Sequence, residues 1–280
     1  MPWRTRRRVG TVLGVLAVIL VGGGAVMMYG FLADETRFDR PSAELDALRS
    51  DVAAVPGVRA VDAQRWVEAP TFSVPSSSVR VSAEAEALPA VLKTACSTAY
   101  PEAVSWNLDV DTAAGTGVWL HADATRGCPD FGLDPGAVVQ GLDRLVPGIR
   151  ISASIGEGGR LVLSSMEEPS PDFADVLPLV DRADDLRSAA GIDPDAVVEV
   201  GSSLLIVDVE AGAGAATRTL LTTLTDRYQV TGFFAGGSGT PVDGVDKVQV
   251  TAPAQHHAAI TGAIAGSGLP FAALPVSFLG

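Results

Sequence analysis

The chain has 280 residues, 47% of them apolar and 6% aromatic, and its formal net charge is −13. Nucleic-acid binding needs clustered lysine and arginine to neutralise phosphates, and no such cluster follows residue 40, so nucleic acid is excluded as a partner. A Cys/His metal site needs four ligands at close spacing, which the two cysteines and three histidines do not provide, and the sequence predicts no metal and no cofactor.

The most distinctive segment covers residues 9–33, which carry no charge and follow a basic tail at residues 1–8. A bilayer core about 30 Å thick needs roughly 20 apolar residues in a helix, so this segment is long enough to be a transmembrane helix. The arginines of the tail predict a cytoplasmic N-terminus, with all later residues extracytoplasmic. We therefore expect a single-pass protein of the cell membrane, in which residues 34–40 form a linker.

A cleaved secretory signal is the alternative interpretation of this segment. Such signals have an apolar core of about 7–15 residues and small residues before the cleavage site, whereas here the core is longer and Phe31 is bulky. The glycines at positions 22–24 would let a second helix approach closely, so self-association through this segment is a further alternative.

The remaining chain alternates between helical and strand-like patterns. Apolar residues at three- and four-residue spacing predict helices over residues 41–55, 87–99, 134–146, 173–190, 215–228 and 255–265. Alternating or short apolar runs predict strands over 58–67, 79–83, 103–111, 117–122, 151–155, 161–165, 197–200, 204–209, 229–235, 247–251 and within 271–279. One helix thus recurs after every two strands.

A short motif recurs at two of the predicted junctions from helix to strand. Residues 55–59 read Val-Pro-Gly-Val-Arg and residues 146–150 read Val-Pro-Gly-Ile-Arg. Pro-Gly is a common stop signal for a helix, so a generic turn could also produce the match. Because the elements around both copies follow the same order, we interpret it as an internal repeat.

One helix after every two strands is the order found in split β-α-β sandwiches, whose antiparallel sheets carry helices on one face. The fold class predicted is therefore α+β, with the transmembrane helix followed by two or three ferredoxin-like α/β sandwich repeats. We expect domains at residues 41–130 and 131–210, and residues 211–280 as a third unit or the completion of the second.

The helix ending in Val-Pro-Gly-Val at residues 55–58, followed by strands and a second helix, resembles the BON-type modules of bacterial envelope proteins. The likeness covers about 70 residues twice and lacks clear glycine positions of that family. The resemblance implies a non-catalytic module that binds envelope or membrane components.

Cys96 and Cys128 are the only cysteines, and both fall on the extracytoplasmic side of the predicted topology. In an oxidising compartment they would form a disulfide, which stabilises by about 3–4 kcal/mol in the chain-entropy model. Two buried free thiols are the alternative.

Several segments carry residues of chemical interest without a complete motif. The sequence Gly212-Ala213-Gly214 lies between a strand and a helix but lacks the third glycine of a dinucleotide fingerprint. The pair Asp109 and Asp111 lacks the remaining ligands of a calcium loop. We interpret the first as a strand-to-helix loop and the second as part of a hairpin.

No nucleophile stands out. Ser202 and Ser238 each follow a glycine without the full Gly-x-Ser-x-Gly elbow, and His121, His256 and His257 are the only histidines. Adjacent side chains on a helix point about 100° apart, so the last two would not share one metal. The sequence therefore predicts no catalytic residue.

The function predicted is a membrane-anchored, extracytoplasmic binding or scaffolding protein of the cell envelope, with an envelope protein as partner and a sheet face or edge strand as the binding surface. The protein is not expected to be an enzyme. The alternatives are an extracytoplasmic hydrolase, with a site built from scattered acids and His121, and a small subunit of a larger membrane complex.

Overall fold

The computed structural model describes residues 37–69, 74–98, 100–166, 173–236 and 245–279. Twelve strands form a single sheet in which their spatial order is their order along the chain. The strands are β1 (Arg37–Asp39), β2 (Val58–Glu68), β3 (Ser76–Glu84), β4 (Val104–Asp111), β5 (Gly117–Thr125), β6 (Arg150–Ile155), β7 (Leu161–Ser165), β8 (Val198–Gly201), β9 (Leu205–Val209), β10 (Gly232–Ala235), β11 (Val248–Thr251) and β12 (Val276–Leu279).

Helices occupy the intervals that the sequence predicts, in the described ranges. They are α2 (Ala43–Ala53), α3 (Leu88–Ser97), α4 (Pro135–Leu145), α5 (Phe173–Asp181), α6 (Ala183–Ala190), α7 (Gly214–Tyr228) and α8 (His257–Ala265). Local capping explains their starts: the side chains of Ser42 and Asp134 accept hydrogen bonds from backbone N–H groups of the first turns of α2 and α4. Every predicted strand overlaps an observed one, and β1 is an additional strand within the predicted linker.

The strand pairing alternates strictly from β2 onward. Strands joined by a hairpin or short loop pair antiparallel, as in β4 with β5 and β6 with β7. From β2 onward, strands joined through a helix pair parallel with their direct neighbour, as in β3 with β4 and β5 with β6, whereas β1 pairs antiparallel with β2 across α2. Each helix therefore returns the chain to the position immediately beside the strand it has just left.

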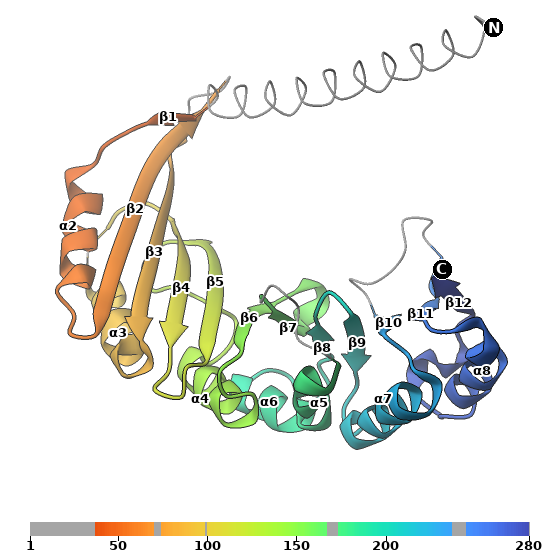
Figure 1. Cartoon of the computed structure of the whole chain (residues 1–280). Helices are drawn as coiled ribbons and strands as arrows, with labels where there is room; N and C mark the ends of the chain where they lie inside the picture. The colour runs from red at the N-terminus through yellow and green to blue at the C-terminus, as the bar shows by residue number, and fades with distance from the viewer. Residues whose placement is uncertain (1–36, 70–73, 99, 167–172, 237–244, 280) are drawn as a thin grey trace, which may run out of the picture.

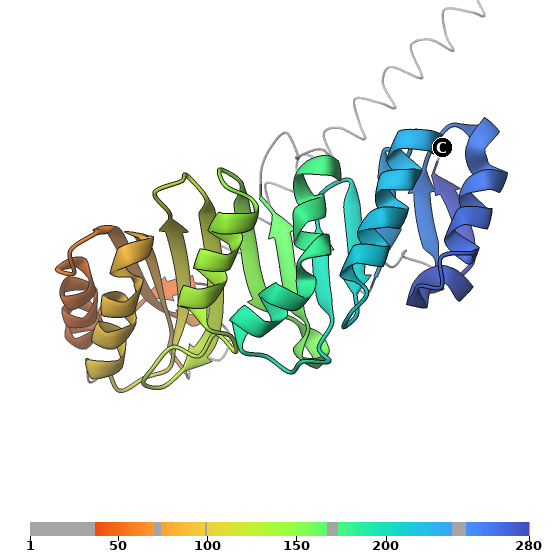
Figure 2. The same ribbon diagram turned by 90° about the horizontal axis from the view of Figure 1, so that it is seen from below.

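The helices of the described ranges all lie on one side of this sheet. Figure 1 shows them along the lower, outer side of a bent sheet, and Figure 2 shows them in front of the strands when the molecule is seen from below. The core lies between these two layers, where alternate strand residues such as Val81, Leu108 and Leu120 pack with helix residues such as Val138 and Leu142, each at most 1% exposed. The opposite face of the sheet, on the inside of the bend, carries no helix in the described ranges.

The predicted fold class is wrong. In a split β-α-β sandwich, another strand separates the two parallel strands that a helix connects, and this closes each unit into its own sheet. Here the parallel strands are direct neighbours, so the sheet continues without interruption from one strand pair to the next. The structure is one mixed sheet and not a transmembrane helix followed by separate ferredoxin-like sandwiches. The predicted limits at residues 130/131 and 210/211 fall in loops that the sheet bridges.

The prediction of a single-pass protein located in the cell membrane, with extracytoplasmic domains, is also corrected. Within the described ranges, no helix is long and apolar enough to cross a bilayer. The longest of them, α7, has 15 residues and carries Arg218, Asp226 and Arg227. The segment 9–33, on which the prediction rested, lies outside the described residues.

The recurring Val-Pro-Gly motif has the same structural role at both sites. Gly57 ends the turn between α2 and β2 with φ of +86°, and Gly148 ends the turn between α4 and β6 with φ of +83°. This left-handed backbone conformation is accessible to glycine at little cost. The motif therefore sets the direction in which each strand leaves the preceding helix.

The predicted helix over residues 173–190 is two helices, interrupted at Arg182 (φ −107°, ψ 24°). In the second helix, α6, the Arg187 side chain points inward. Its guanidinium is 3% exposed, donates to the backbone oxygens of Ala196 at 2.5 Å and Val209 at 3.1 Å, and pairs with Asp184. These contacts tie α6 to the loop before β8 and to the end of β9.

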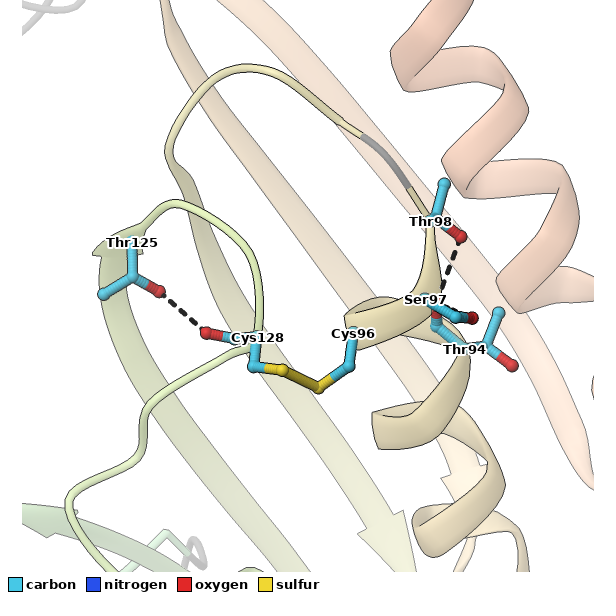
Figure 3. The surroundings of a disulfide bond; sticks show 6 residues. All are labelled: Thr94, Cys96, Ser97, Thr98, Thr125 and Cys128. Carbon is cyan, nitrogen blue, oxygen red and sulfur yellow. Dashed lines mark hydrogen bonds between the residues drawn. A yellow bond between two sulfur atoms is a disulfide. The ribbon is translucent and has the colours of Figure 1, made fainter.

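The predicted disulfide between Cys96 and Cys128 is present. It joins the last turn of α3 to the loop that follows β5, as Figure 3 shows. Thr98 and Thr125 reinforce the two sides, because their hydroxyls donate to the backbone oxygens of Thr94 at 3.0 Å and Cys128 at 3.2 Å. The bond thus links two successive strand pairs on the helix side of the sheet.

A second link between strand pairs centres on Glu102, in the loop before β4. The Arg65 guanidinium donates twice to its carboxylate, at 2.7 Å each, and Tyr100 donates at 2.9 Å while bonding Ser77 at 2.8 Å. The hydrogen bonds from Arg65 are the main reason why the pKa of Glu102 falls from 4.5 to about 2. Burial opposes this shift, and the bond from Tyr100 adds to it.

We predict that replacing both Cys96 and Cys128 with Ser lowers the free energy of unfolding by about 3–4 kcal/mol, since the unfolded chain loses a loop constraint. Urea denaturation of the wild-type and double variant measures this difference. A reducing agent should destabilise the wild type by a similar amount and leave the double variant unchanged. Equal midpoints for the oxidised wild type and the variant would refute the stabilising role.

We predict that Glu102→Gln lowers the free energy of unfolding by about 1–3 kcal/mol at neutral pH, as expected for hydrogen bonds to a charged group. Because folding lowers the pKa of Glu102, its stabilisation is complete above pH 4.5 and is lost as the pH falls toward about 2. The difference between wild type and variant should shrink over this window in denaturant titrations.

The matched control for Glu102 is Glu68→Gln, because the Glu68 carboxylate is 57% exposed and lies 3.7 Å from Arg37. An exposed ion pair of this kind contributes little, so this variant should resemble the wild type. A pH-independent difference between wild type and Glu102→Gln would contradict the assigned role of the Glu102 carboxylate.

Candidate functional site

The face of the sheet that carries no helix in the described ranges is here called the uncovered face. The strand register continues one row of side chains across it from β2 to β12, because directly opposed residues share a face. The row comprises Ala60, Ser82, Asp109, Trp119, Ser152, Ser164, Gly201, Ile206, Phe234, Gln249 and Ser277. Its members are largely polar near β3 to β7 and include apolar side chains toward β9 and β10.

A hollow of about 330 Å³ lies on the uncovered face over β3 to β7. We call it the sheet hollow and define it by the residues that line it, which are Arg80, Asp109, Gly117, Trp119, Arg150 and Met166. Trp119 is half-buried and Met166 is 53% exposed. The hollow therefore combines a large aromatic ring, a flexible apolar side chain and two guanidinium groups.

Arg150 forms one wall of the sheet hollow. Its guanidinium donates to the Asp109 carboxylate at 2.7 Å and lies 3.5 Å from the Asp111 carboxylate. Gly117 is the residue opposite Arg150 on β5, and a Cβ there would lie 3.0 Å from the guanidinium carbon. The absence of a side chain at Gly117 thus gives Arg150 the space to lie across β5 toward β4.

Both arginines of the repeated motif meet at one carboxylate. Asp111 also pairs with Arg59, which lies at an irregularity in the pairing of β2 with β3. Arg59 comes from the first copy of the motif and Arg150 from the second, and they bind Asp111 from opposite sides in strand order. The two arginines of the repeated motif therefore connect β2 and β6 to β4 through two ion pairs, which span β3 and β5.

Arg80 differs from Arg150 in that it is not bound. It is exposed near the middle of β3, and its guanidinium makes no hydrogen bond and no ion pair within 4 Å with any described residue. Its register neighbours are Asp62 on β2 and Asn107 on β4. Within the described ranges, Arg80 is therefore the cation of the sheet hollow available to a carboxylate from outside.

His121 lies beside the sheet hollow. Its ring stacks on Trp119 with centroids 5.8 Å apart, its Nδ1 lies 3.1 Å from the Asn107 side-chain oxygen, and its Nε2 lies 3.4 Å from Asp123. No serine, threonine or cysteine of the described ranges hydrogen-bonds to this ring. The observed contacts orient His121 and support the Trp119 ring from one side.

A second charged cluster occupies the uncovered face at β8 and β9. Glu199 is buried at 2% exposure, and its carboxylate accepts a hydrogen bond from Arg160 at 3.1 Å. The same guanidinium lies 3.8 Å from Asp208. Because Arg160 covers the Glu199 carboxylate, this cluster is closed, in contrast to the sheet hollow.

The other predicted candidates do not assemble into a site. His256 precedes α8 and packs against Tyr228, whereas His257 stacks on Phe278 and contacts the backbone oxygen of Ala252. No group of three His, Cys, Asp or Glu side chains within the described ranges could hold a metal ion. The rings of His256 and His257 thus lie in different contacts.

The two loops of chemical interest have structural roles. Gly212, with φ of +74°, lies in the loop between β9 and α7, as predicted, and Asp109 and Asp111 end β4 before the hairpin to β5. The Ser202 hydroxyl accepts hydrogen bonds from the backbone N–H groups of Leu204 and Leu205 in the turn before β9. Ser238 lies outside the described residues.

The sequence prediction missed the sheet hollow. The alternating pattern of residues 79–83 predicted a strand, and the repeated motif marked Arg150, but neither signal showed that Arg80 and Arg150 line one hollow with Trp119. Comparisons with family models, curated proteins and solved structures found no match to this chain.

We predict that Arg150 and Asp111 are energetically coupled. A double-mutant cycle with Arg150→Gln and Asp111→Asn should give a coupling free energy of about 0.5 kcal/mol, since both groups are partly solvated, and added salt should reduce it. Chemical denaturation of the four proteins measures it. The control is Arg144→Gln, because that guanidinium donates to the backbone oxygen of Gln140. An equal coupling for Arg144 would contradict the assignment.

Proposed function

We propose that this protein is a non-catalytic binding or scaffolding module that holds a partner protein on the uncovered face, at the sheet hollow. The observation that carries the proposal is the combination of a half-buried Trp119, an exposed Met166 and an Arg80 without an ion pair to described residues, all on a sheet face without a helix cover. Tryptophan, methionine and arginine are enriched in protein interfaces.

The chemistry of the sheet hollow defines the partner segment. An apolar side chain of the partner would pack on Trp119 and Met166, and a neighbouring carboxylate would pair with Arg80. Arg150 contributes less directly, because Asp109 and Asp111 already neutralise it. Its role is to keep one wall of the hollow in place, which reduces the entropic cost of binding.

A photo-crosslinking amino acid at Ser82 or Ser152 tests the proposal, because these residues flank the sheet hollow in the same row as Trp119. We expect both positions to capture one protein from a native extract. The same group at Lys93, exposed on α3 on the helix side, should not capture it. Equal capture from both sides of the sheet would contradict the proposal.

The purified partner then allows the affinity to be measured. Trp119→Ala and Arg80→Ala should each weaken binding about tenfold or more, as expected for central interface residues. The matched control is Trp66→Ala, because Trp66 lies on the uncovered face at β2 outside the sheet hollow. Unchanged affinity for both hollow variants, or an equal loss for Trp66→Ala, would refute this site.

A hydrolase that uses His121 remains the second candidate function. The observation in its favour is that Asn107 and Asp123 orient the imidazole ring beside the sheet hollow. A candidate base with a defined orientation is one requirement for acid–base catalysis. Hydrolysis of ester or phosphoester substrates that is abolished by His121→Ala and retained by Trp66→Ala would favour this candidate over the binding module.

A further inference from the structure

The two edge strands of the sheet, β1 and β12, differ in their solvent exposure and in their charge. At one end, β1 is three residues long, and all three are exposed, with charges at Arg37 and Asp39. Short, charged edge strands discourage pairing with another chain. At the other end, β12 has the uncharged sequence Val-Ser-Phe-Leu and pairs only with β11 in the described ranges. With four residues, β12 is also short, but in contrast to β1 it lacks the protective charges.

The backbone of β12 presents a regular set of hydrogen-bonding groups to the free edge. The Val248 N–H donates to the Pro275 oxygen at 3.0 Å, which shows that Pro275 faces β11. In a parallel pair, alternate residues bond the same neighbour, so Ser277 and Leu279 also face β11. The N–H and C=O groups of Val276 and Phe278 consequently point away from β11.

The side chains at this edge are incompletely buried. Val276 and Phe278 belong to the helix side and pack against the core, and Phe278 stacks on His257 with ring centroids 3.6 Å apart. Both are only half-buried, whereas Val248 and Val250 on the adjacent strand are 0% exposed. The hydrophobic core thus extends to the edge of the sheet, where its side chains are partly exposed to solvent.

We propose that β12 pairs with β12 of a second copy of this chain, antiparallel and around a twofold axis at Ser277. This register places Val276 opposite Phe278 of the partner subunit and uses the four outward backbone groups of each strand. It also keeps the apolar side chains of both copies on the helix side, since opposed residues share a face. The alternation of apolar, Ser and apolar residues is the same in either direction, which makes the edge self-complementary.

Engineered disulfides test the register directly. Opposed residues without hydrogen bonds to each other have Cα atoms about 4.5 Å apart, within the range for a disulfide. Ser277→Cys should therefore give a covalent dimer under mild oxidation, while Cys96 and Cys128 stay paired with each other. Gln249→Cys is the matched control, because Gln249 is the neighbour of Ser277 one strand inward. Failure of Ser277→Cys to cross-link, or equal cross-linking of Gln249→Cys, would overturn the proposal.

A second pair of variants tests the backbone hydrogen bonds. Val276→Pro removes an N–H that points to the free edge, which an edge strand tolerates. By light scattering after size-exclusion chromatography, the wild type and Val276→Thr should be dimers and Val276→Pro a monomer, with similar thermal unfolding of the folded chains. A monomeric wild type at all concentrations, or a dimeric and folded Val276→Pro, would refute the pairing. Arg80→Ala and Trp119→Ala should leave the dimer intact, which separates this inference from the proposed function.

Discussion

The structure depends on one topological constraint, which is that every helical connection delivers the chain to the strand position directly beside the previous one. The parallel pairs β3 with β4, β5 with β6 and β7 with β8 are all direct neighbours. Because no strand is left between them, no unit can close on itself, and the sheet extends for as long as the pattern continues. Because the helices of the described ranges all lie on the same side, they bury one face of the sheet and leave the other face without a helix cover (Figures 1 and 2).

The position of the helices on one side of the sheet explains where the charged side chains lie. On the helix side, few charged side chains are buried, and those that are have specific partners. Arg187, for example, donates hydrogen bonds to the backbone oxygens of Ala196 and Val209. On the uncovered face, charged side chains remain partly solvated and form ion pairs across strands. Arg59, Arg150 and Asp111 together brace the three strands between them. The sheet hollow lies beside these ion pairs, and Arg150 belongs to both.

The sheet also has two edge strands, β1 and β12, which differ in how readily they would pair with a further strand. Arg37 and Asp39 give β1 a solvated end, while the apolar side chains of β12 leave part of the core near solvent. Because each strand pairs with the next, no gap in the hydrogen bonding separates β1 from β12. The links supplied by the disulfide and by Arg65 with Glu102 bind the first strand pairs together, at the end that is also the more solvated.

The sequence by itself determined most helices, strands and turns, since these follow from local signals: apolar spacing, the caps at Ser42 and Asp134, and the Pro-Gly turns at residues 56–57 and 147–148. It did not show β1 or the break between α5 and α6. Only the tertiary structure decided which strands are neighbours. The contact of Arg150 with Asp109 joins residues 41 positions apart, and no local pattern specifies such a register. The same spacing of elements suits a split sandwich and a continuous sheet, so the choice between them depends on which packing buries the helix faces best.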